Sequence, residues 1–364
     1  MRFPEIIEEA LSGKSLDFNQ LITLYRNEDL SALMFAGHQI RKKMHPHNNV
    51  GWMIDRNVNI TNVCTSGCLF CNFHCSKKSK RAYVTSIEEY KLKIEELYRF
   101  GGNQLLIQGG MHPDLGLEFY EELFSTLKHF YPDIKLHALG PPEIVYLSQK
   151  SKLDYTLVLK RLIAAGLDSL PGAGAEILDN AIRKKISPNK CSADEWLEVM
   201  RIAHLFNLTT SATMMFGHIE DFEHRIEHLL KIRDLQAIKP PSSKGFLSFI
   251  PWPVQYEGTA LFKKYRSLSR ISATDYLRLI AISRMALNNI PNIQSSLLTI
   301  GKNVAQVSLH SGANDLGSIM IEENVVSSAG SGYRVGVNEM KKNIFEAGFM
   351  PKQRNQNFEF ILED

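Results

Sequence analysis

Cysteine is scarce in this chain of 364 residues: there are five, and four of them fall between positions 64 and 75. Disulfide-stabilised domains are short and dense in cysteine, so the composition excludes that class and favours a reducing, cytoplasmic location. Long apolar runs are also missing, since none approaches the roughly 18 residues that cross a bilayer. The 42 basic and 39 acidic residues leave a net charge of +3, which gives no indication of nucleic acid or a membrane surface. We therefore expect a cytoplasmic, globular protein with no nucleic-acid partner and no membrane insertion.

Low-complexity segments and long flexible linkers are absent as well, so domain boundaries are drawn from the spacing of apolar residues alone. Residues 1–50 carry apolar residues at helical spacing and predict an N-terminal helical extension. Between residues 51 and 350, short strand-like runs alternate with longer amphipathic runs, which defines the main domain. Residues 351–364 are left as a C-terminal tail.

The alternation in the main domain predicts an α/β fold. Strands are expected at 53–61, 103–110, 134–139, 169–172, 209–216, 245–251 and 292–296, with helices between them and a weak last unit near 318–325. Repeated strand–helix units build a parallel sheet with right-handed crossovers. Six to eight units without a central break favour a closed or nearly closed (β/α) TIM-type barrel over a doubly wound sheet. Functional residues are then expected at the carboxyl ends of the strands.

Three of the cysteines follow the first predicted strand directly. Cys64, Cys68 and Cys71 have C-x3-C-x2-C spacing. Thiolates are the soft, anionic ligands that iron–sulfur clusters use. Three of them on one short loop can hold three irons of a cubane cluster, and the fourth iron then stays open to an external ligand, as an open zinc position does in catalysis.

A structural zinc site is the main alternative for this loop. Such a site needs four ligands, and either His74 or Cys75 supplies a fourth at suitable spacing. A four-cysteine electron-transfer cluster is less favoured, because it uses C-x2-C-x2-C spacing. Cys75 and Cys191 are otherwise expected to be ordinary small residues. A non-catalytic zinc or iron–sulfur protein therefore stays open beside an enzyme.

The pattern C-x3-C-x-aromatic-C, with Phe70 as the aromatic residue, resembles the radical S-adenosylmethionine (SAM) superfamily. The resemblance implies that Cys64, Cys68 and Cys71 hold a 4Fe–4S cluster. The amino and carboxylate groups of SAM would chelate the unique iron. Electron transfer into SAM would then cleave it to methionine and a 5′-deoxyadenosyl radical.

The same resemblance assigns further residues to SAM. Gly109 and Gly110, in "IQGGMHP", are similar to the glycine motif that meets the SAM amino group, although a plain tight turn also uses glycines. Glu176, in "LPGAGAEIL", matches the position of a polar residue that contacts the ribose or amino group, and an acid that starts a helix is the alternative. A cation for the SAM carboxylate is expected, and Arg183 and Arg201 are both candidates.

Several segments resemble a narrower group, the menaquinone-biosynthesis enzymes that act on futalosine derivatives and the related deazaflavin synthase subunits. They are "QGGMHPDL", "SATMMFGHIED", "FIPWPVQ" and "MIEENVVSSAG", and the likeness runs from about residue 50 to 350. "HALGPPEI" and "FIPWPVQ" are most similar to the cyclic dehypoxanthine futalosine synthases. Aminofutalosine synthase and a deazaflavin synthase subunit remain alternatives.

The resemblance implies a radical cyclisation of dehypoxanthine futalosine. Hydrogen would be abstracted from ribose C4′, the carbon radical would add to the benzoate ring, and loss of an electron and a proton would restore aromaticity. An electron donor such as flavodoxin or ferredoxin is implied as a partner.

A proton acceptor for this reaction is sought among the histidines. Histidine has an unperturbed pKa near 6.5, which suits proton transfer around neutral pH. His112, His137, His218 and His310 lie at or near predicted strand ends or in late loops. His218, in "FGHIE" after the strand at 209–216, is the leading catalytic candidate, and a purely structural role is the alternative for each of the four.

Overall fold

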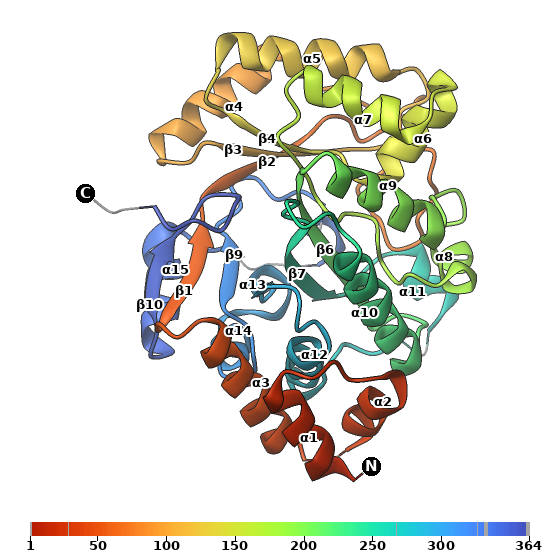
Figure 1. Ribbon diagram of the computed structural model, residues 1–364. Helices are drawn as coiled ribbons and strands as arrows, with labels where there is room; N and C mark the ends of the chain where they lie inside the picture. The colour runs from red at the N-terminus through yellow and green to blue at the C-terminus, as the bar shows by residue number, and fades with distance from the viewer. Residues whose placement is uncertain (1, 28, 267, 326, 331–333, 362–364) are drawn as a thin grey trace.

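The computed structural model describes residues 2–27, 29–266, 268–325, 327–330 and 334–361. Its N-terminal helices are α1 (Phe3–Ser12), α2 (Phe18–Arg26) and α3 (Leu30–Met44). They lie together at one end of the molecule, at the bottom of Figure 1, where α2 packs on α10 (Phe222–Ala237) and both α2 and α3 pack on α12 (Ala273–Ala286). The helical extension is therefore fastened to the outside of the main domain.

The main domain is built around seven parallel strands whose order in the sheet follows the order in the chain. They are β2 (Asp55–Asn59), β3 (Gln104–Gln108), β4 (Lys135–Ala138), β5 (Ser169–Leu170), β6 (Thr209–Phe216), β7 (Phe246–Pro253) and β8 (Asn292–Ile293). Helices run around the outside of these strands in Figure 1, namely α4 (Ile87–Arg99), α5 (Leu117–Phe130), α6 (Pro141–Ser151), α7 (Tyr155–Ala164), α8 (Asn180–Ile186), α9 (Ala193–Leu205), α10, α11 (Ala260–Lys264) and α12. This is the sequential β/α order of a TIM-type barrel.

Strand β9 (Asp315–Ser318) and the residues just after it close the ring. On one side Gln294 bridges to Asp315, and on the other Arg56 bridges to Ile321. The backbone N–H of Ser295 donates to the Asp315 carbonyl at 2.8 Å, and that of Asn57 donates to the Ile321 carbonyl at 3.1 Å. The expectation of a closed or nearly closed barrel is thus confirmed. The pairings that close it, on either side of β9, are short.

The strand expected at 53–61 is divided in two. Its first part belongs to β1 (Asn49–Met53), which pairs with β9 and with β10 (Met350–Gln353) in a small parallel sheet, while β2 enters the barrel. One continuous stretch of chain therefore joins the two sheets.

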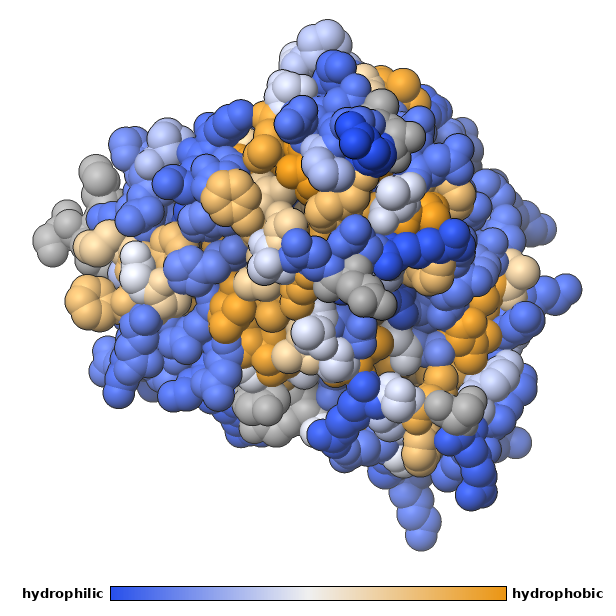
Figure 2. Space-filling view, turned by 90° about the horizontal axis from the view of Figure 1, so that it is seen from below, coloured by the Kyte–Doolittle hydropathy of each residue, from blue (hydrophilic) through white to orange (hydrophobic). Residues whose placement is uncertain are grey.

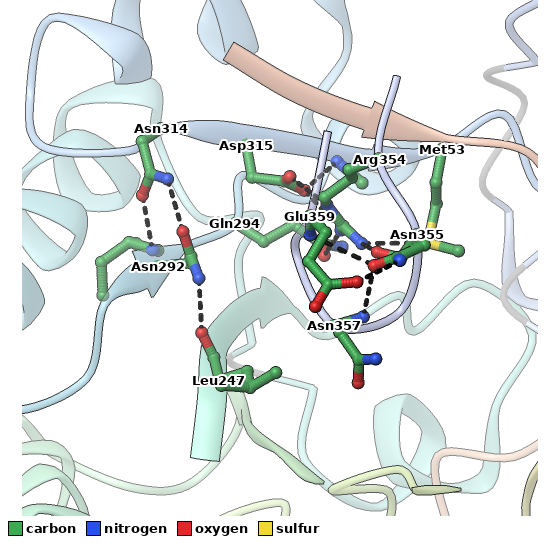
Figure 3. A network of polar contacts seen from close by, with 12 residues as sticks. Met53, Leu247, Asn292, Gln294, Asn314, Asp315, Arg354, Asn355, Asn357 and Glu359 are labelled. Atoms are coloured by element: carbon green, nitrogen blue, oxygen red, sulfur yellow. Dashed lines mark hydrogen bonds and ion pairs between the residues drawn. The ribbon is translucent and has the colours of Figure 1, made fainter. Parts of the chain in front are cut away.

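The segment set apart as a C-terminal tail contributes β10 and then crosses the amino-terminal end of the barrel. Gln356 accepts a hydrogen bond from Ser169 Oγ at 2.9 Å, and Asn357 accepts one from Thr209 Oγ1 at 2.8 Å. Ser169 and Thr209 are the first residues of β5 and β6. We call residues 354–358 the floor of the barrel, and Figure 3 shows part of their polar network.

Local signals explain most helices. Helix α4, for example, begins with a capping box in which Ser86 and Glu89 bond each other's backbone N–H, and it buries Tyr90, Ile94 and Leu97 along one stripe. Helix α6 was not expected. It begins with two prolines, which suit the first turn because its N–H groups have no partner inside the helix.

The surface seen from the end that carries α1–α3 is mostly hydrophilic, with apolar areas among the polar side chains (Figure 2). Of the helices that lie within the described ranges, none combines the length and apolar character needed to cross a membrane.

Candidate active site

A cavity of about 430 Å³ occupies the interior of the barrel. Alternate residues of the strands line it, as the two-residue period of a strand requires: Asp55, Asn57 and Asn59 from β2, Gln104, Leu106 and Gln108 from β3, and Ser211, Thr213 and Met215 from β6. The lining extends from the cysteine loop to the floor, which contributes Arg354, Gln356 and Phe358. The cavity therefore joins the carboxyl ends of the strands to the barrel centre.

The three cysteines of the motif all line this cavity. Ser66 Oγ lies 3.0 Å from Cys64 Sγ and 3.3 Å from Cys68 Sγ, and the Met111 backbone N–H donates to Cys64 Sγ at 3.3 Å. Cys68 is buried, which raises the pKa of its thiol. The three sulfurs thus share one wall, and polar groups that can support anionic sulfur already surround them.

Cys71 differs from Cys68 in its surroundings. Burial alone would raise the pKa of its thiol, but hydrogen bonds from His74 outweigh it and lower the pKa. The His74 side chain also lies 2.8 Å from the Cys71 carbonyl oxygen through Nδ1.

The remaining two cysteines do not line the cavity, as expected. The backbone N–H of Cys75 donates to the Asn62 carbonyl at 2.8 Å, and Cys191 is buried beside Arg183. Within the described ranges, no three His, Cys, Asp or Glu side chains converge closely enough to hold a single metal ion. A cluster does not need such convergence, because each thiolate binds a different iron.

The glycine pair sits against the cysteine loop. A Cβ atom on Gly110 would lie 2.1 Å from the Val63 carbonyl oxygen and 2.8 Å from Cys64 Cβ, so only glycine fits there. The Gly110 N–H donates to the Thr61 carbonyl at 2.8 Å. Gly109 also lines the cavity, and both glycines let β3 approach the loop closely.

Glu176 and Phe70 meet at a lysine that the sequence analysis did not single out. Lys190 Nζ lies 2.7 Å from Glu176 Oε1 and 5.5 Å from the centroid of the Phe70 ring. All three residues line the cavity. Burial alone would lower the pKa of Lys190, but the Cys68 thiolate and the Glu176 carboxylate outweigh it and raise the pKa. Lys190 therefore carries a positive charge next to the cysteines.

Neither arginine that was a candidate for the SAM carboxylate faces the cavity. Arg183 is buried, and its guanidinium donates to the carbonyl groups of Cys191 and Ala175. Arg201 lies on α9 and pairs with Glu198 at 2.8 Å on the outer surface. The cation beside the cysteine loop is Lys190, which stands between two helices in a stretch without periodicity.

His218, the leading catalytic candidate, is also placed away from the cavity. Its side chain is fully buried and pairs with Glu220 at 2.9 Å, and its Nε2 lies 3.1 Å from the Met215 carbonyl oxygen. Burial alone would raise the pKa of Glu220, but His218 and Arg225 outweigh it and lower the pKa to about 2. The residue stands at the end of β6 as expected, yet its carboxylate neighbour turns the imidazole into the protein.

Of the other histidines considered, His137 lines the cavity and His112 and His310 do not. His137 Nδ1 lies 2.7 Å from Ser169 Oγ, and burial lowers the pKa of the imidazole to about 4. His310 is exposed and bonds the Ala347 carbonyl at 2.9 Å. His137 therefore contributes a neutral imidazole near the floor, and His74 lines the cavity at the cysteine loop.

Glu143, at the start of α6, is a lining residue that sequence reasoning missed. Its Oε2 is buried and has no hydrogen-bond partner among the described residues. Burial raises the pKa of this carboxyl to about 7, although Lys190 acts in the opposite direction. Sequence reasoning missed Glu143 because it missed helix α6, where a glycine and two prolines precede the acid in "GPPEI".

Comparison with known families decides between an enzyme of this kind and a structural metal protein. Residues 58–232 match the family model "Radical SAM superfamily", and residues 243–363 match "CofH/MqnC C-terminal region". The chain belongs to the radical SAM superfamily. Its cofactors are therefore a 4Fe–4S cluster and SAM, and the three thiols, the glycine turn and the Glu176–Lys190 pair form a donor set that fits both.

Two curated relatives of this radical SAM protein are named "Cyclic dehypoxanthine futalosine synthase". The protein of Streptomyces coelicolor is 40% identical to this chain, and the match covers 98% of this chain and 88% of the relative. The protein of Halalkalibacterium halodurans is 38% identical, and the match covers 99% of this chain and 95% of the relative. An "Aminodeoxyfutalosine synthase" of Thermus thermophilus is 35% identical over 97% and 94%.

Solved structures agree on the fold. Methylornithine synthase superposes with a TM-score of 0.72 at 19% identity, over 96% of this chain and 98% of that chain. The hydrogenase maturase HydG superposes with a TM-score of 0.75 at 15% identity, over 96% of this chain and 75% of HydG.

Proposed function

We propose that this radical SAM enzyme converts dehypoxanthine futalosine to its cyclic product in menaquinone biosynthesis. The observation that carries the proposal is nearly full-length identity of about 40% to a relative of that name, combined with a cavity that joins the cysteine loop to the barrel centre. A volume of about 430 Å³ is in the range of sites for small organic molecules.

The cofactor residues follow from the geometry of the cysteine loop. Cys64, Cys68 and Cys71 hold the cluster, and the Met111 N–H stabilises the sulfur of Cys64 by the hydrogen bond already present. When bound, the cluster and SAM supply a 5′-deoxyadenosyl radical that takes a hydrogen atom from the substrate.

The remaining polar groups of this wall bind SAM. Gly109 and Gly110 leave room for the methionine part of SAM, and Lys190 provides the positive charge for its carboxylate. Glu176, held by Lys190, offers its second oxygen to a ribose diol or an amino group. Phe70 forms an apolar surface beside them.

Glu143 is the proton acceptor in this proposal, in place of His218. Restoring the aromatic ring after cyclisation requires a base, and a base is most effective when its pKa is close to the working pH. The carboxyl of Glu143 meets this requirement with a pKa of about 7, whereas burial lowers the pKa of His137 to about 4. Its unpartnered Oε2 is free to take the proton.

An electron donor such as flavodoxin or ferredoxin delivers the electron. The exposed basic residues Lys78, Lys80 and Arg81 follow the cysteine loop directly and suit an acidic protein surface. Reduction of the cluster by flavodoxin should therefore slow as salt is added, while reduction by dithionite should not. Equal rates at low and high salt would contradict this contact.

The reaction itself is tested by anaerobic reconstitution with iron and sulfide, followed by incubation with SAM, dithionite and dehypoxanthine futalosine. The cyclase should give free 5′-deoxyadenosine and a product two hydrogens lighter than the substrate. An aminofutalosine synthase instead builds the adenosyl group into its product, so an adduct formed from its substrate would overturn the assignment.

A further inference from the structure

Strands β2 and β3 present a group of amide side chains on the cavity wall that no role described so far uses. Asn57, Asn59 and Gln104 line the cavity, and 3%, 3% and 4% of their surfaces are exposed. We call these three residues the amide wall. They come from adjacent parallel strands, and Asn57 and Asn59 point the same way because they are two residues apart.

Each residue of the amide wall keeps one buried polar atom unpaired. Within the described part of the chain, Asn57 Oδ1, Asn59 Nδ2 and Gln104 Oε1 have no hydrogen-bond partner. An unpaired buried polar atom destabilises a fold, so most such atoms in native proteins have partners. Three of them on one cavity wall indicate that a ligand completes their hydrogen bonds.

Neighbouring side chains fix which atom is available in two of the three amides, Gln104 and Asn59. Gln104 Nε2 donates to the Asp55 carboxylate at 3.4 Å, which leaves the Gln104 carbonyl oxygen as the free group. Asn324 Nδ2 donates to Asn59 Oδ1 at 3.2 Å, which leaves the Asn59 amide N–H free. Together with Asn57 Oδ1, the wall offers two acceptors and one donor.

This set suits groups that both donate and accept hydrogen bonds, as the hydroxyl groups of a sugar do. A carboxylate cannot donate to the two acceptors, and an ammonium group cannot accept from Asn59. A hydroxyl group does both. The three amides carry no charge, so they give a buried anion no charged partner.

We propose that the amide wall binds the hydroxyl groups of a sugar ring in the substrate. The inference rests on the proposed function, in which that sugar is the ribose of dehypoxanthine futalosine. Hydroxyl groups held on β2 and β3 orient the ring inside the barrel, and hydrogen abstraction from one ring carbon depends on such orientation. Asn57 and Gln104 are then specificity-determining residues.

The test uses two variants that remove the free acceptors while roughly keeping side-chain shape, Asn57→Leu and Gln104→Met. Asn288→Leu is the control, because Asn288 bonds Gly13 and Ser15 on the outside of the molecule. Binding of dehypoxanthine futalosine to the reconstituted protein is measured by calorimetry, and the ratio of 5′-deoxyadenosine to cyclised product is measured in turnover.

Each wall variant should bind the substrate about tenfold more weakly, the usual effect of one lost hydrogen bond to a neutral group. SAM cleavage should become uncoupled, so that the ratio of 5′-deoxyadenosine to product rises. The melting temperature of Asn57→Leu without substrate should stay or increase, because an unpaired buried atom has been removed. The control should match the wild type in all three.

The outcomes separate the inference from the function on which it rests. If the wild type forms the cyclised product and both wall variants bind substrate with unchanged affinity and coupling, the assignment of the amide wall is overturned and the function stands. If the folded wild type neither binds nor converts the substrate, the proposed function fails and the inference with it.

Discussion

The floor and the walls of the barrel differ in how fully their buried polar groups are hydrogen-bonded. On the floor, Arg354 donates through Nε and Nη2 to the two oxygens of Asp315 and through Nη1 to Met53 Sδ and the Asn355 carbonyl. Nearby, a second chain of bonds runs from Asn314 to Asn292 and on to the Leu247 carbonyl (Figure 3). On the walls, by contrast, Glu143 and the amide wall retain buried atoms that have no partner in the described chain.

The difference shows where the molecule is built for stability and where it is built for a ligand. A saturated network fixes the position of the chain end under the barrel and seals that end. Unsaturated groups lower the stability of the ligand-free protein and gain partners only when a ligand is present. Variants of the cysteines, the floor and the cavity walls test this division.

The largest effect is expected at the cysteines. Cys68→Ala should abolish cluster binding and SAM cleavage, because a thiolate ligand is lost. Iron content, visible absorbance and 5′-deoxyadenosine formation measure this. Cys191→Ala is the matched control, since Cys191 is also buried but lies outside the cavity. Loss of the cluster in Cys191→Ala would show that the ligands are wrongly assigned.

On the floor, Arg354→Met should lower the free energy of unfolding by about 3–5 kcal/mol, because the buried carboxylate of Asp315 then lacks its cation. Denaturant titration measures the change. A double variant that also carries Asp315→Leu should recover part of the loss, since the uncompensated charge is removed with its partner. An unchanged single variant would mean that the floor does not stabilise the barrel.

For Glu143→Gln, product formation should fall about 100-fold or more while 5′-deoxyadenosine is still released, because only the proton acceptor is removed. The wild-type rate should decline as the pH drops below about 7, and the variant should not show this limb. A variant with the wild-type rate and pH profile would exclude Glu143 as the base.

The same carboxyl predicts a pH dependence of stability. Its pKa is raised from 4.5 to about 7 in the folded protein, so its contribution is fully present below pH 4.5 and is lost as the pH rises through about 7. The loss is at most about 3 kcal/mol, and Glu143→Gln should not show it in melting curves recorded across this range.

The smallest effect concerns the cation at the cavity. Lys190→Met should weaken SAM binding about tenfold or more, because a charge-assisted hydrogen bond to the SAM carboxylate is lost. Lys190→Arg should retain most of the affinity. Arg201→Ala, which removes the surface pair with Glu198, should bind SAM like the wild type. If equilibrium dialysis showed weaker SAM binding in Arg201→Ala than in Lys190→Met, Arg201 and not Lys190 would be the cation for the SAM carboxylate.

Much of the fold could be predicted, because strong periodicity and clear end signals coincide. The strand expected at 209–216, for example, has the bounds of β6. The sequence pattern does not indicate that β1 and β2 are separated at Ile54, because the alternation of apolar and polar residues continues through this position. The return of the chain to β10 under the barrel depends on contacts far apart in sequence, and local pattern does not contain them.

The site was predictable where chemistry is concentrated in a motif and not where it is dispersed. The three cysteines, Phe70 and the glycine pair stand together at strand ends, and the structure brings them to one cavity. His218 was misplaced because Glu220, two residues on, binds its imidazole. The alternation of Asp55, Asn57 and Asn59 did indicate a strand, but its polar face turns into the barrel and not toward solvent. Sequence alone does not distinguish these two orientations.

The claim that a three-cysteine cluster binds SAM at an open iron is tested most directly by electron paramagnetic resonance of the reduced, reconstituted protein with and without SAM. The account predicts a 4Fe–4S signal whose shape changes when SAM is added, because the nucleotide becomes a ligand of the fourth iron. A signal that is identical in both samples, from a cluster with all four irons bound by side chains, would contradict it.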